Sequence, residues 1–468
     1  MTKFFRAPLF LILFFSFLIR LYNLNYNSPF LDEAIYLVLG RKVLAGHWQE
    51  AAPFGWVGGM PLFYPAISAL FGTFGILGAR FLNVLLGTFS VYLAYEFAKC
   101  LQLSDQQKTN ERIGLIASAF MGILAIPIYL SRIAIYDMLS FSLFLSGLVF
   151  IQKALIIENP DLWQQENRFG LAAVAFFLSF LAKYTTLILF PLIIIWTIFK
   201  SLQSDKETFS KSIFYLTIPL AIAISGYLAW NFNDLAHFMR DQVRDPQNKT
   251  PEILSQFTMY SIFPLITGVV GGLILFFKNK RSTVLYLLLG ATIPSVVHIL
   301  TNNLKAAHQH TFLSIVFLLP LSAYLFSVLL KEKSLIGKFI LPFALIVIFI
   351  YSQNQVVTLE TSWTNTNKVM SALKSFTSRH EKVLSSEDDI TILALPNLKE
   401  ENIKGIYNFQ YNNLSDQTAY GKALEESYFD FVLINEENSD RVSNVIKKSL
   451  TSHYDIIYNN SPFLVYKK

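Results

Sequence analysis

The stretch Phe30-Leu-Asp-Glu-Ala-Ile-Tyr-Leu-Val-Leu-Gly-Arg-Lys-Val-Leu-Ala-Gly46 follows directly on the first apolar segment of the chain, which places it at a membrane surface. Two adjacent carboxylates, Asp32 and Glu33, begin it, and apolar residues then recur at helical spacing. This pattern predicts a short amphipathic helix lying on the membrane. Acidic residues at a helix start complement the helix dipole, which is one explanation of the pair. The other explanation is that Asp32 is a catalytic carboxylate held at the boundary between water and lipid.

The composition indicates a polytopic α-helical membrane protein. Hydrophobic residues make up 53% of the chain and charged residues 15%, whereas soluble domains have about 25% charged residues. The mean hydropathy is +0.44. The net charge of +6 does not indicate a nucleic-acid partner, because cytoplasmic loops of membrane proteins collect Lys and Arg. Cys100 is the single cysteine, so an intramolecular disulfide and a cysteine-based metal site are both excluded.

Apolar segments of roughly 17–25 residues, the length that spans a bilayer, are expected for such a chain. We place them at 7–22, 80–98, 113–130, 138–157, 169–182, 184–199, 212–230, 258–277, 282–300, 311–330 and 339–357. This gives about eleven transmembrane helices. No small-residue cleavage site follows the first segment, so we expect it to remain as a helix.

The basic residues predict the orientation of these spans. If the spans alternate, Lys and Arg concentrate in the set of loops that includes Lys3 and Arg6. The positive-inside rule puts this set in the cytoplasm. We therefore expect a multi-pass protein of the cell membrane with a cytoplasmic N-terminus, and a first outer loop, 23–79, that carries Asp32 and Glu33.

The end of the chain, residues 358–468, predicts a small extracytoplasmic α/β domain that follows a transmembrane domain of residues 1–357. Helical patterns cover 367–380 and 441–450, and strand patterns cover 383–386, 390–395, 430–435, 454–458 and 463–466. This segment has no Gly-rich phosphate loop and no cluster of His or acidic residues. We expect it to bind, cover or stabilise rather than to catalyse.

Basic residues should be rare on the outer face, so the exceptions indicate candidates for an anion site. They are Arg41, Lys42, Arg80, Arg132, Lys183, Arg240, Arg244, Lys249 and Lys305. Any one of them could extend to lipid headgroups. As a set they share the face that carries Asp32, which favours an anion site there.

Three further patterns bear on this site. Arg132 and Asp137 lie five residues apart in the second outer loop, where they either close the turn as a salt bridge or take part in function. Lys183 interrupts apolar sequence and would be a suitable point charge for a phosphate. His308 and His310 do not share one helix face. On an extended loop they could still converge with Asp32 or Asp137 on a metal ion.

The motif Asp32-Glu-Ala-Ile-Tyr36, followed by Gly46, resembles the first outer loop of the protein O-mannosyltransferase and aminoarabinose transferase group. These bacterial and archaeal proteins are membrane-embedded glycosyltransferases of the GT-C fold. The remaining matches follow in the family's order. They are Gly59-Met-Pro-Leu-Phe-Tyr-Pro65, Gly78-Ala-Arg80-Phe-Leu-Asn83, Arg132 with Asp137, and Leu181-Ala-Lys183-Tyr184. The segment His308-Gln-His310 departs from the basic–aromatic pair of many relatives, which leaves the sugar and the acceptor open.

The resemblance implies an inverting glycosyltransferase that moves a sugar from a polyprenyl-phosphate carrier to an acceptor hydroxyl outside the cytoplasm. Such chemistry needs a carboxylate that takes the acceptor's proton, and the resemblance implies Asp32, with Glu33 and Asp137 beside it. It also needs cations on the departing phosphate. The candidates for this are Arg132, Lys183, Arg240 and Arg244, and the other site candidates are Tyr36, Arg80, Lys305, His308 and His310.

The implied reaction requires no cofactor, although a divalent metal ion held by Asp32, His308 and His310 stays open as an alternative. The expected partners are the lipid-linked sugar donor, the bilayer, and a protein, lipid or glycan acceptor.

Two other classes of function were weighed. A transporter or flippase of lipid-linked saccharides could also use outward cations, but it favours polar groups near the bilayer midplane in paired broken helices. A scaffold that only displays the C-terminal domain leaves Asp32-Glu33 and Arg132–Asp137 unexplained.

Overall fold

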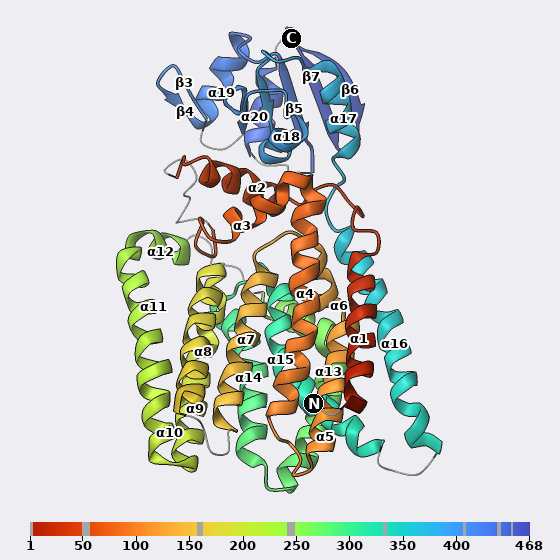
Figure 1. Cartoon of the computed structure of the whole chain (residues 1–468). Coiled ribbons are helices and arrows are strands. Elements are labelled where there is room, and N and C mark those ends of the chain that lie inside the picture. The colour runs from red at the N-terminus through yellow and green to blue at the C-terminus, as the bar shows by residue number, and fades with distance from the viewer. Residues whose placement is uncertain are drawn as a thin grey trace.

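The computed structural model describes residues 3–48, 57–156, 162–240, 249–330, 335–405, 409–437, 441–450 and 453–468. It consists of a helical bundle with a small α/β domain at one end (Figure 1). Two short helices of the first outer loop, α2 (Leu31–Leu44) and α3 (Tyr64–Phe71), lie between the two parts (Figure 1).

Long helices run side by side in the bundle (Figure 1). They are α1 (Lys3–Leu21), α4 (Gly75–Cys100), α5 (Gln107–Ile123), α6 (Ala125–Arg132), α7 (Asp137–Leu155), α8 (Leu162–Ala182), α9 (Phe190–Ser204), α11 (Ile218–Trp230), α13 (Thr250–Phe277), α14 (Arg281–Thr301), α15 (Ala307–Leu329) and α16 (Leu335–Glu360). The short helices α10 (Lys206–Lys211) and α12 (Phe232–Phe238) flank α11, and a 3-10 turn, Tyr184–Leu189, precedes α9.

Every apolar segment expected from the sequence coincides with one of these helices or with a pair of them. Within the described ranges, 8 helices are long and apolar enough to cross a membrane. The count is 9 if α5 and α6, which meet at a bend of 58°, form one broken span. The chain is thus a multi-span membrane protein, while the number eleven stays a prediction.

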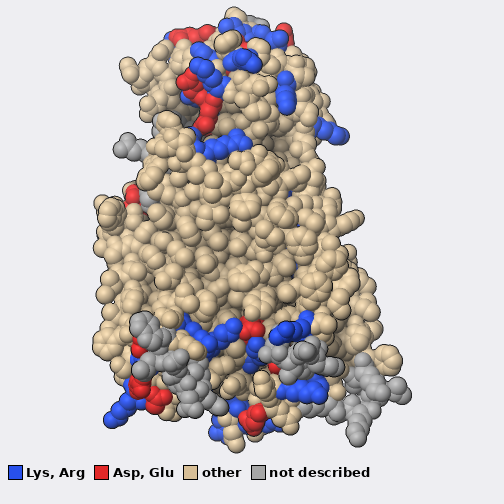
Figure 2. Space-filling model, in the orientation of Figure 1, with Lys and Arg blue, Asp and Glu red and all other residues tan. Residues whose placement is uncertain are grey.

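The surface of the bundle fits a lipid environment. Figure 2 shows charged side chains at the foot of the bundle and on the α/β domain, with a broad and almost uncharged band between them. Large apolar side chains are exposed on the bundle helices, among them Phe214, Ile222 and Phe343. An apolar surface of this extent is expected against lipid and not against water.

The C-terminal domain is built on a five-stranded sheet of order β2-β1-β5-β7-β6. Its strands are β1 (Val383–Ser385), β2 (Ile403–Gly405), β5 (Phe431–Asn435), β6 (Asp455–Asn460) and β7 (Phe463–Lys467). The first three of these in the sheet order, β2, β1 and β5, are parallel, and β7 is antiparallel to both of its neighbours. All five residues of β5 are buried, as expected for a central strand that is covered on both faces.

Four helices and a hairpin complete this domain. They are α17 (Asn367–Phe376), α18 (Asp388–Ala394), α19 (Asp416–Glu425), α20 (Arg441–Ser449), and the strands β3 (Gln410–Tyr411) and β4 (Leu414–Ser415). The predicted α/β architecture is confirmed. The predicted strand at 390–395 is wrong, because these residues form α18. The apolar run there is too short to distinguish a strand from a helix, and the two acids before it favour a helix start.

The expectation that α2 lies on the membrane as an amphipathic helix also needs correction. Residues 33–40 are buried without interruption, so no face of this part of the helix is free. The C-terminal domain covers one side, where Ala34 joins that domain's apolar core. On the other side α3 crosses so closely that a Cβ atom at Gly40 would collide with the carbonyl oxygen of Pro65. The helix is therefore held between the two domains.

Candidate active site

Glu33 is fully buried, and both of its carboxylate oxygens are occupied. Arg80 donates from Nε to Oε1 and from Nη2 to Oε2, each at 2.8 Å. The backbone N–H of Ala134 donates to Oε1 at 2.7 Å, and that of Phe30 donates to Oε2 at 2.8 Å. A carboxylate with four donors has no capacity left for a substrate. Glu33 therefore fixes the start of α2 against α4 and against the loop that leads into α7.

Asp32, the preceding residue, is in the opposite situation. It is half-buried, and no hydrogen bond or ion pair is found for it among the described residues. The pKa of Asp32 is raised to about 6, chiefly by burial and also by the negative charge of Asp137, while the positive charge of Lys183 lowers it. A carboxylate of this basicity is largely ionised at neutral pH and is a better proton acceptor than an ordinary aspartate.

Lys183 and Asp137 form a buried ion pair, and the charges of both residues act on Asp32. Lys183 lies at the break between α8 and the following 3-10 turn, and its ammonium group donates to Oδ1 of Asp137. It also donates to Oε1 of Gln309 at 3.3 Å and lies 4.9 Å from the ring centroid of Tyr136. Oδ2 of Asp137 is buried and has no hydrogen-bond partner among the described residues.

Arg132 pairs with Glu360 and Asp137 pairs with Lys183, so the alternative that Arg132 and Asp137 close the turn as a salt bridge is wrong. Nη1 of Arg132 lies 3.0 Å from a carboxylate oxygen of Glu360 at the end of α16, and Nη2 of Arg132 donates to the carbonyl oxygen of Tyr22 at 2.7 Å. After the short connection Ile133–Tyr136, Asp137 pairs with Lys183 at the end of α8 and not with Arg132. Arg80 likewise forms a buried ion pair, with Glu33.

Tyrosine rings form one wall beside the ion pair. Tyr36, one helical turn after Asp32, has its ring centroid 5.0 Å from that of Tyr136 and 5.6 Å from that of Tyr64. All three side chains are largely buried. The sequence pointed to Tyr36, and the structure adds Tyr64 and Tyr136 to it.

The start of α15 supplies the opposite polar groups. Gln309 contacts Lys183, whereas the ring of His308 packs near those of Tyr129 and Tyr260, at centroid distances of 6.0 and 6.3 Å. His310 lies beside the buried His298 of α14, with 2.7 Å between Nδ1 of His310 and Nε2 of His298.

The hydrogen bonds fix the tautomers of this histidine pair. Nδ1 of His298 faces the carbonyl oxygen of Asn303, which can only accept, so this nitrogen carries a proton. In two neutral rings, Nε2 of His298 then accepts from Nδ1 of His310. Nε2 of His310 is left as an acceptor, and it is buried with no partner among the described residues.

The remaining candidates lie apart from this cluster or outside the description. Arg240 is exposed beyond α12 and donates to Nδ1 of His237 at 2.6 Å, and Lys305 is exposed between α14 and α15. Arg244 lies outside the described residues. Within the described ranges, no three His, Cys, Asp or Glu residues are grouped as a metal site requires, so Asp32, His308 and His310 do not form one.

The first outer loop is tied directly to the segment around Lys183. The N–H of Met60 donates to the carbonyl oxygen of Leu181 at 2.7 Å, and the N–H of Tyr184 donates to that of Gly58 at 2.9 Å. A Cβ atom at Gly59 would collide with the carbonyl oxygen of Ala182, so this close approach requires glycine.

Gln309 was missed in the sequence analysis because nothing in the sequence indicates that the start of α15 reaches Lys183.

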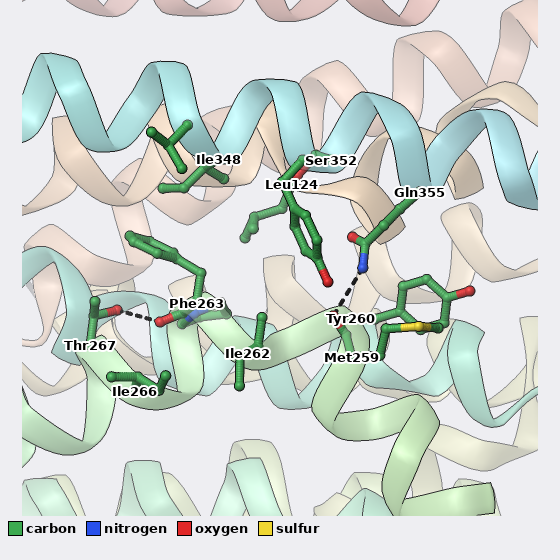
Figure 3. Close-up of a pocket in the computed structure, with 13 residues that line it drawn as sticks. Leu124, Met259, Tyr260, Ile262, Phe263, Ile266, Thr267, Ile348, Ser352 and Gln355 are labelled. Atoms are coloured by element: carbon green, nitrogen blue, oxygen red, sulfur yellow. Dashed lines mark hydrogen bonds between the residues drawn. The ribbon is translucent and has the colours of Figure 1, made fainter.

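A groove of about 340 Å³ lies between α13 and α16 (Figure 3). Its lining is apolar apart from a few polar groups, and Gln355 of α16 donates to the carbonyl oxygen of Met259 across it at 2.9 Å. Tyr260 lines the groove and also packs near His308. The groove thus approaches the polar cluster from the membrane-spanning part of the bundle.

Known proteins share parts of this sequence and its fold. Residues 49–240 match the protein family described as dolichyl-phosphate-mannose-protein mannosyltransferase. No curated protein matches the chain. Among solved structures, ArnT from Cupriavidus metallidurans in the apo state has a TM-score of 0.67 at 10% identity, over 99% of this chain and 97% of that protein. ArnT bound to undecaprenyl phosphate has a TM-score of 0.62 at 10% identity, over 99% and 97% of the two chains.

The oligosaccharyltransferase AglB from Archaeoglobus fulgidus is similar as well. Its complex with an inhibitory peptide and a dolichol-phosphate has a TM-score of 0.58 at 13% identity, over 99% of this chain and 74% of that protein. At such identities the likeness shows the fold, which is the GT-C fold. The matched family model, which covers part of the chain, and the GT-C fold both agree with the resemblance found in the sequence.

Proposed function

We propose that this protein transfers a single sugar from a polyprenyl-phosphate carrier to an acceptor hydroxyl on the outer face of the membrane, with Asp32 as the general base. One observation carries this assignment. Of the two adjacent acids that begin α2, Glu33 is saturated by four donors, whereas Asp32 has no partner among the described residues and lies within electrostatic reach of the Asp137–Lys183 pair.

The reaction is a single displacement. The acceptor oxygen bonds to the anomeric carbon while its proton passes to the carboxylate of Asp32. The bond between the anomeric carbon and the phosphate oxygen breaks, and its electron pair leaves with the prenyl phosphate. Attack from the face opposite to the leaving group inverts the anomeric carbon. This geometry requires the base and the phosphate-binding cation to lie on opposite sides of the sugar.

Lys183 is the proposed phosphate ligand. Its ammonium group uses two of its three N–H bonds on Asp137 and Gln309, which leaves one for a phosphate oxygen. Negative charge gathers on that oxygen as the sugar departs, so a cation in a dry site stabilises the transition state more than the bound donor. Arg132 and Arg80 are held by Glu360 and Glu33 and are assigned no contact with the phosphate.

Two buried acceptor atoms that have no hydrogen-bond partner among the described residues are suited to the hydroxyl groups of the sugar. They are Oδ2 of Asp137 and Nε2 of His310. A buried acceptor that lacks a donor costs free energy of about 1–3 kcal/mol, and a bound sugar hydroxyl would remove that cost. The prenyl chain is assigned to the apolar groove between α13 and α16, which ends at Tyr260 beside His308.

The steps proposed here use only side chains of this chain, and the described acids and histidines are not grouped as a metal site. A metal requirement is a separate question, since one structure of the Archaeoglobus fulgidus enzyme is a complex with Zn and sulfate. Comparing turnover after treatment with EDTA and after readdition of Mn²⁺ or Zn²⁺ answers it directly.

The decisive experiment uses the full chain in nanodiscs with dolichyl-phosphate-[¹⁴C]mannose and a panel of other polyprenyl-phosphate sugars. Release of free prenyl phosphate together with a labelled acceptor supports the proposal. A transporter of the same lipids would move the donor across a vesicle bilayer without cleaving it. Intact donor in every reaction, with transfer across the bilayer, would replace the enzyme by a transporter.

A further inference from the structure

Residues 22–30, here called the α1–α2 connection, lead directly into the helix that carries Asp32. On one side the connection is bound by the junction between α16 and α17. Nδ2 of Asn27 donates to the carbonyl oxygens of Glu360 and Trp363 at 3.0 and 3.1 Å. Two groups of the junction donate to Ser28. The indole N–H of Trp363 donates to the carbonyl oxygen of Ser28 at 3.1 Å, and the backbone N–H of Thr366 donates to the hydroxyl of Ser28 at 3.0 Å.

On its other side the same connection is bound by two arginines of the bundle. Nη1 of Arg80 donates to the carbonyl oxygens of Leu24 and Asn27 at 2.9 and 3.2 Å. Nη2 of Arg132 donates to those of Tyr22 and Asn23 at 2.7 and 3.0 Å.

The ring of Tyr26 lies between the two guanidinium groups, 4.4 Å from that of Arg80 and 5.2 Å from that of Arg132. The α1–α2 connection is thus bound both by the two arginines of the bundle and by the junction between α16 and α17.

Glu360 links the two sets of contacts, because it pairs with Arg132 and lies at the junction between α16 and α17. Its carboxylate lies 3.0 Å from Nη1 of Arg132, and the side chains of the two residues are only 6% and 5% exposed. Removing one partner of a buried ion pair leaves the other charge uncompensated, so the pair resists local opening. Glu360 is also the last residue of α16, where the bundle passes into the C-terminal domain.

We propose that Glu360 is a positioning residue for the reaction. Through Arg132 and the α1–α2 connection it holds the start of α2 so that Asp32 faces Asp137 and Lys183, and it thereby couples docking of the C-terminal domain to sugar transfer. This inference rests on the function proposed above only where it refers to transfer. The mechanical part, that Glu360 holds α2, stands on the contacts alone.

The test compares Glu360→Gln with the matched control Glu436→Gln, which removes one charge from an exposed ion pair with Lys447 in the same domain. Hydrogen exchange is measured on the full chain in nanodiscs. We expect exchange of the amides in 22–35 to accelerate by about tenfold in Glu360→Gln, because fixed backbone groups lose their anchor, while α7 and α15 stay protected. The control should leave 22–35 unchanged.

Turnover of dolichyl-phosphate-mannose provides the second readout. A misplacement of about 1 Å lowers a rate by up to about 100-fold. We therefore expect kcat of Glu360→Gln to fall by about ten- to a hundredfold with less than about a twofold change in KM for the donor. Trp363→Phe, which removes one hydrogen bond and keeps the ring packing, should produce a smaller effect of the same kind.

Unchanged exchange at 22–35 in both Glu360→Gln and Trp363→Phe would overturn the inference, and so would faster exchange confined to the C-terminal domain. The exchange measurement needs no turnover. A wild-type protein that fails to transfer sugar would therefore count against the proposed function, while the exchange data would still decide whether Glu360 holds α2. Equal losses in kcat and in donor affinity would show a general disruption of the site in place of positioning.

Discussion

Asp32 and Glu33 are neighbours in α2, yet their carboxylates face different surroundings. Glu33 points into a cage of four donors from α4, the second outer loop and its own helix start. Asp32 is bonded to no described residue and lies within electrostatic reach of Asp137 and Lys183. Adjacent residues of a helix are separated by about 100° around its axis, which explains how one acid can support the structure while the other stays available.

The first prediction concerns Asp32→Asn, which keeps the size of the side chain but cannot accept a proton. Transfer should fall by about a hundredfold or more, in line with general-base contributions of 10²–10⁴. Binding of dolichyl phosphate should persist, because its contacts lie at Lys183. Turnover and binding are measured on protein of equal thermal stability. Full activity would mean that Asp32 serves only to complement the helix dipole.

The second prediction concerns Glu33→Gln. The substitution leaves the guanidinium of Arg80 buried without a counter-charge, which costs about 3–5 kcal/mol when a buried pair is broken. We expect a clear drop in the melting temperature in detergent, with activity reduced in proportion to the folded fraction. Arg80→Lys should destabilise similarly, because lysine cannot make the bidentate contact. A Glu33→Gln protein with normal stability and no activity would show that the base is Glu33 and not Asp32.

The sequence predicted the bundle well because long apolar segments have few alternatives in a bilayer. It also predicted that Asp32, Asp137 and Lys183 share one face. It could not predict their partners: Arg132 and Asp137 are five residues apart, yet they pair with Glu360 and Lys183, which lie far from them in sequence.

Residue pairs of that kind are decided by how helices pack, which periodicity does not encode. The same holds for α2, whose pattern fits a membrane surface but whose second face is covered by α18 from the far end of the chain.

The third prediction concerns the donor. Lys183→Met removes the ammonium group and keeps much of the side-chain volume. Loss of a charge-assisted contact costs roughly 1.5–3 kcal/mol, so binding of dolichyl phosphate should weaken by about ten- to a hundredfold. Lys305→Met, an exposed cation on the same side of the bundle, serves as the control and should bind normally. Equal affinity in both variants would remove Lys183 from the phosphate site.

The fourth prediction concerns orientation. An epitope after Lys468 should be accessible from outside intact cells, while one inserted after Asp205, within the lysine-containing segment 200–211, should not. The expectation rests on the distribution of Lys and Arg among the loops. Accessibility of the second epitope alone would invert the topology, and the proposed site would then face the cytoplasm.

The last prediction concerns the pH dependence of transfer. Asp32 acts as a base only when it is ionised, so kcat/KM should rise with pH and level off above the pKa of about 6. The charges around Asp32 should shift the rising part of this pH profile, here called the limb, in opposite directions. Asp137 raises the pKa of Asp32, so Asp137→Asn should move the limb to lower pH. Lys183 lowers it, so Lys183→Met should move the limb to higher pH in whatever activity remains.

The control for these shifts is His308→Gln, which leaves both charges next to Asp32 in place and should not displace the limb. The profiles are measured at saturating acceptor with dolichyl-phosphate-mannose below its KM, so that they report the enzyme form that has bound acceptor but not donor. Shifts of the same sign in Asp137→Asn and Lys183→Met would contradict the assignment, because removing opposite charges cannot move the pKa of one nearby carboxylate in the same direction. A limb that is insensitive to both variants would mean that the ionising group is not Asp32.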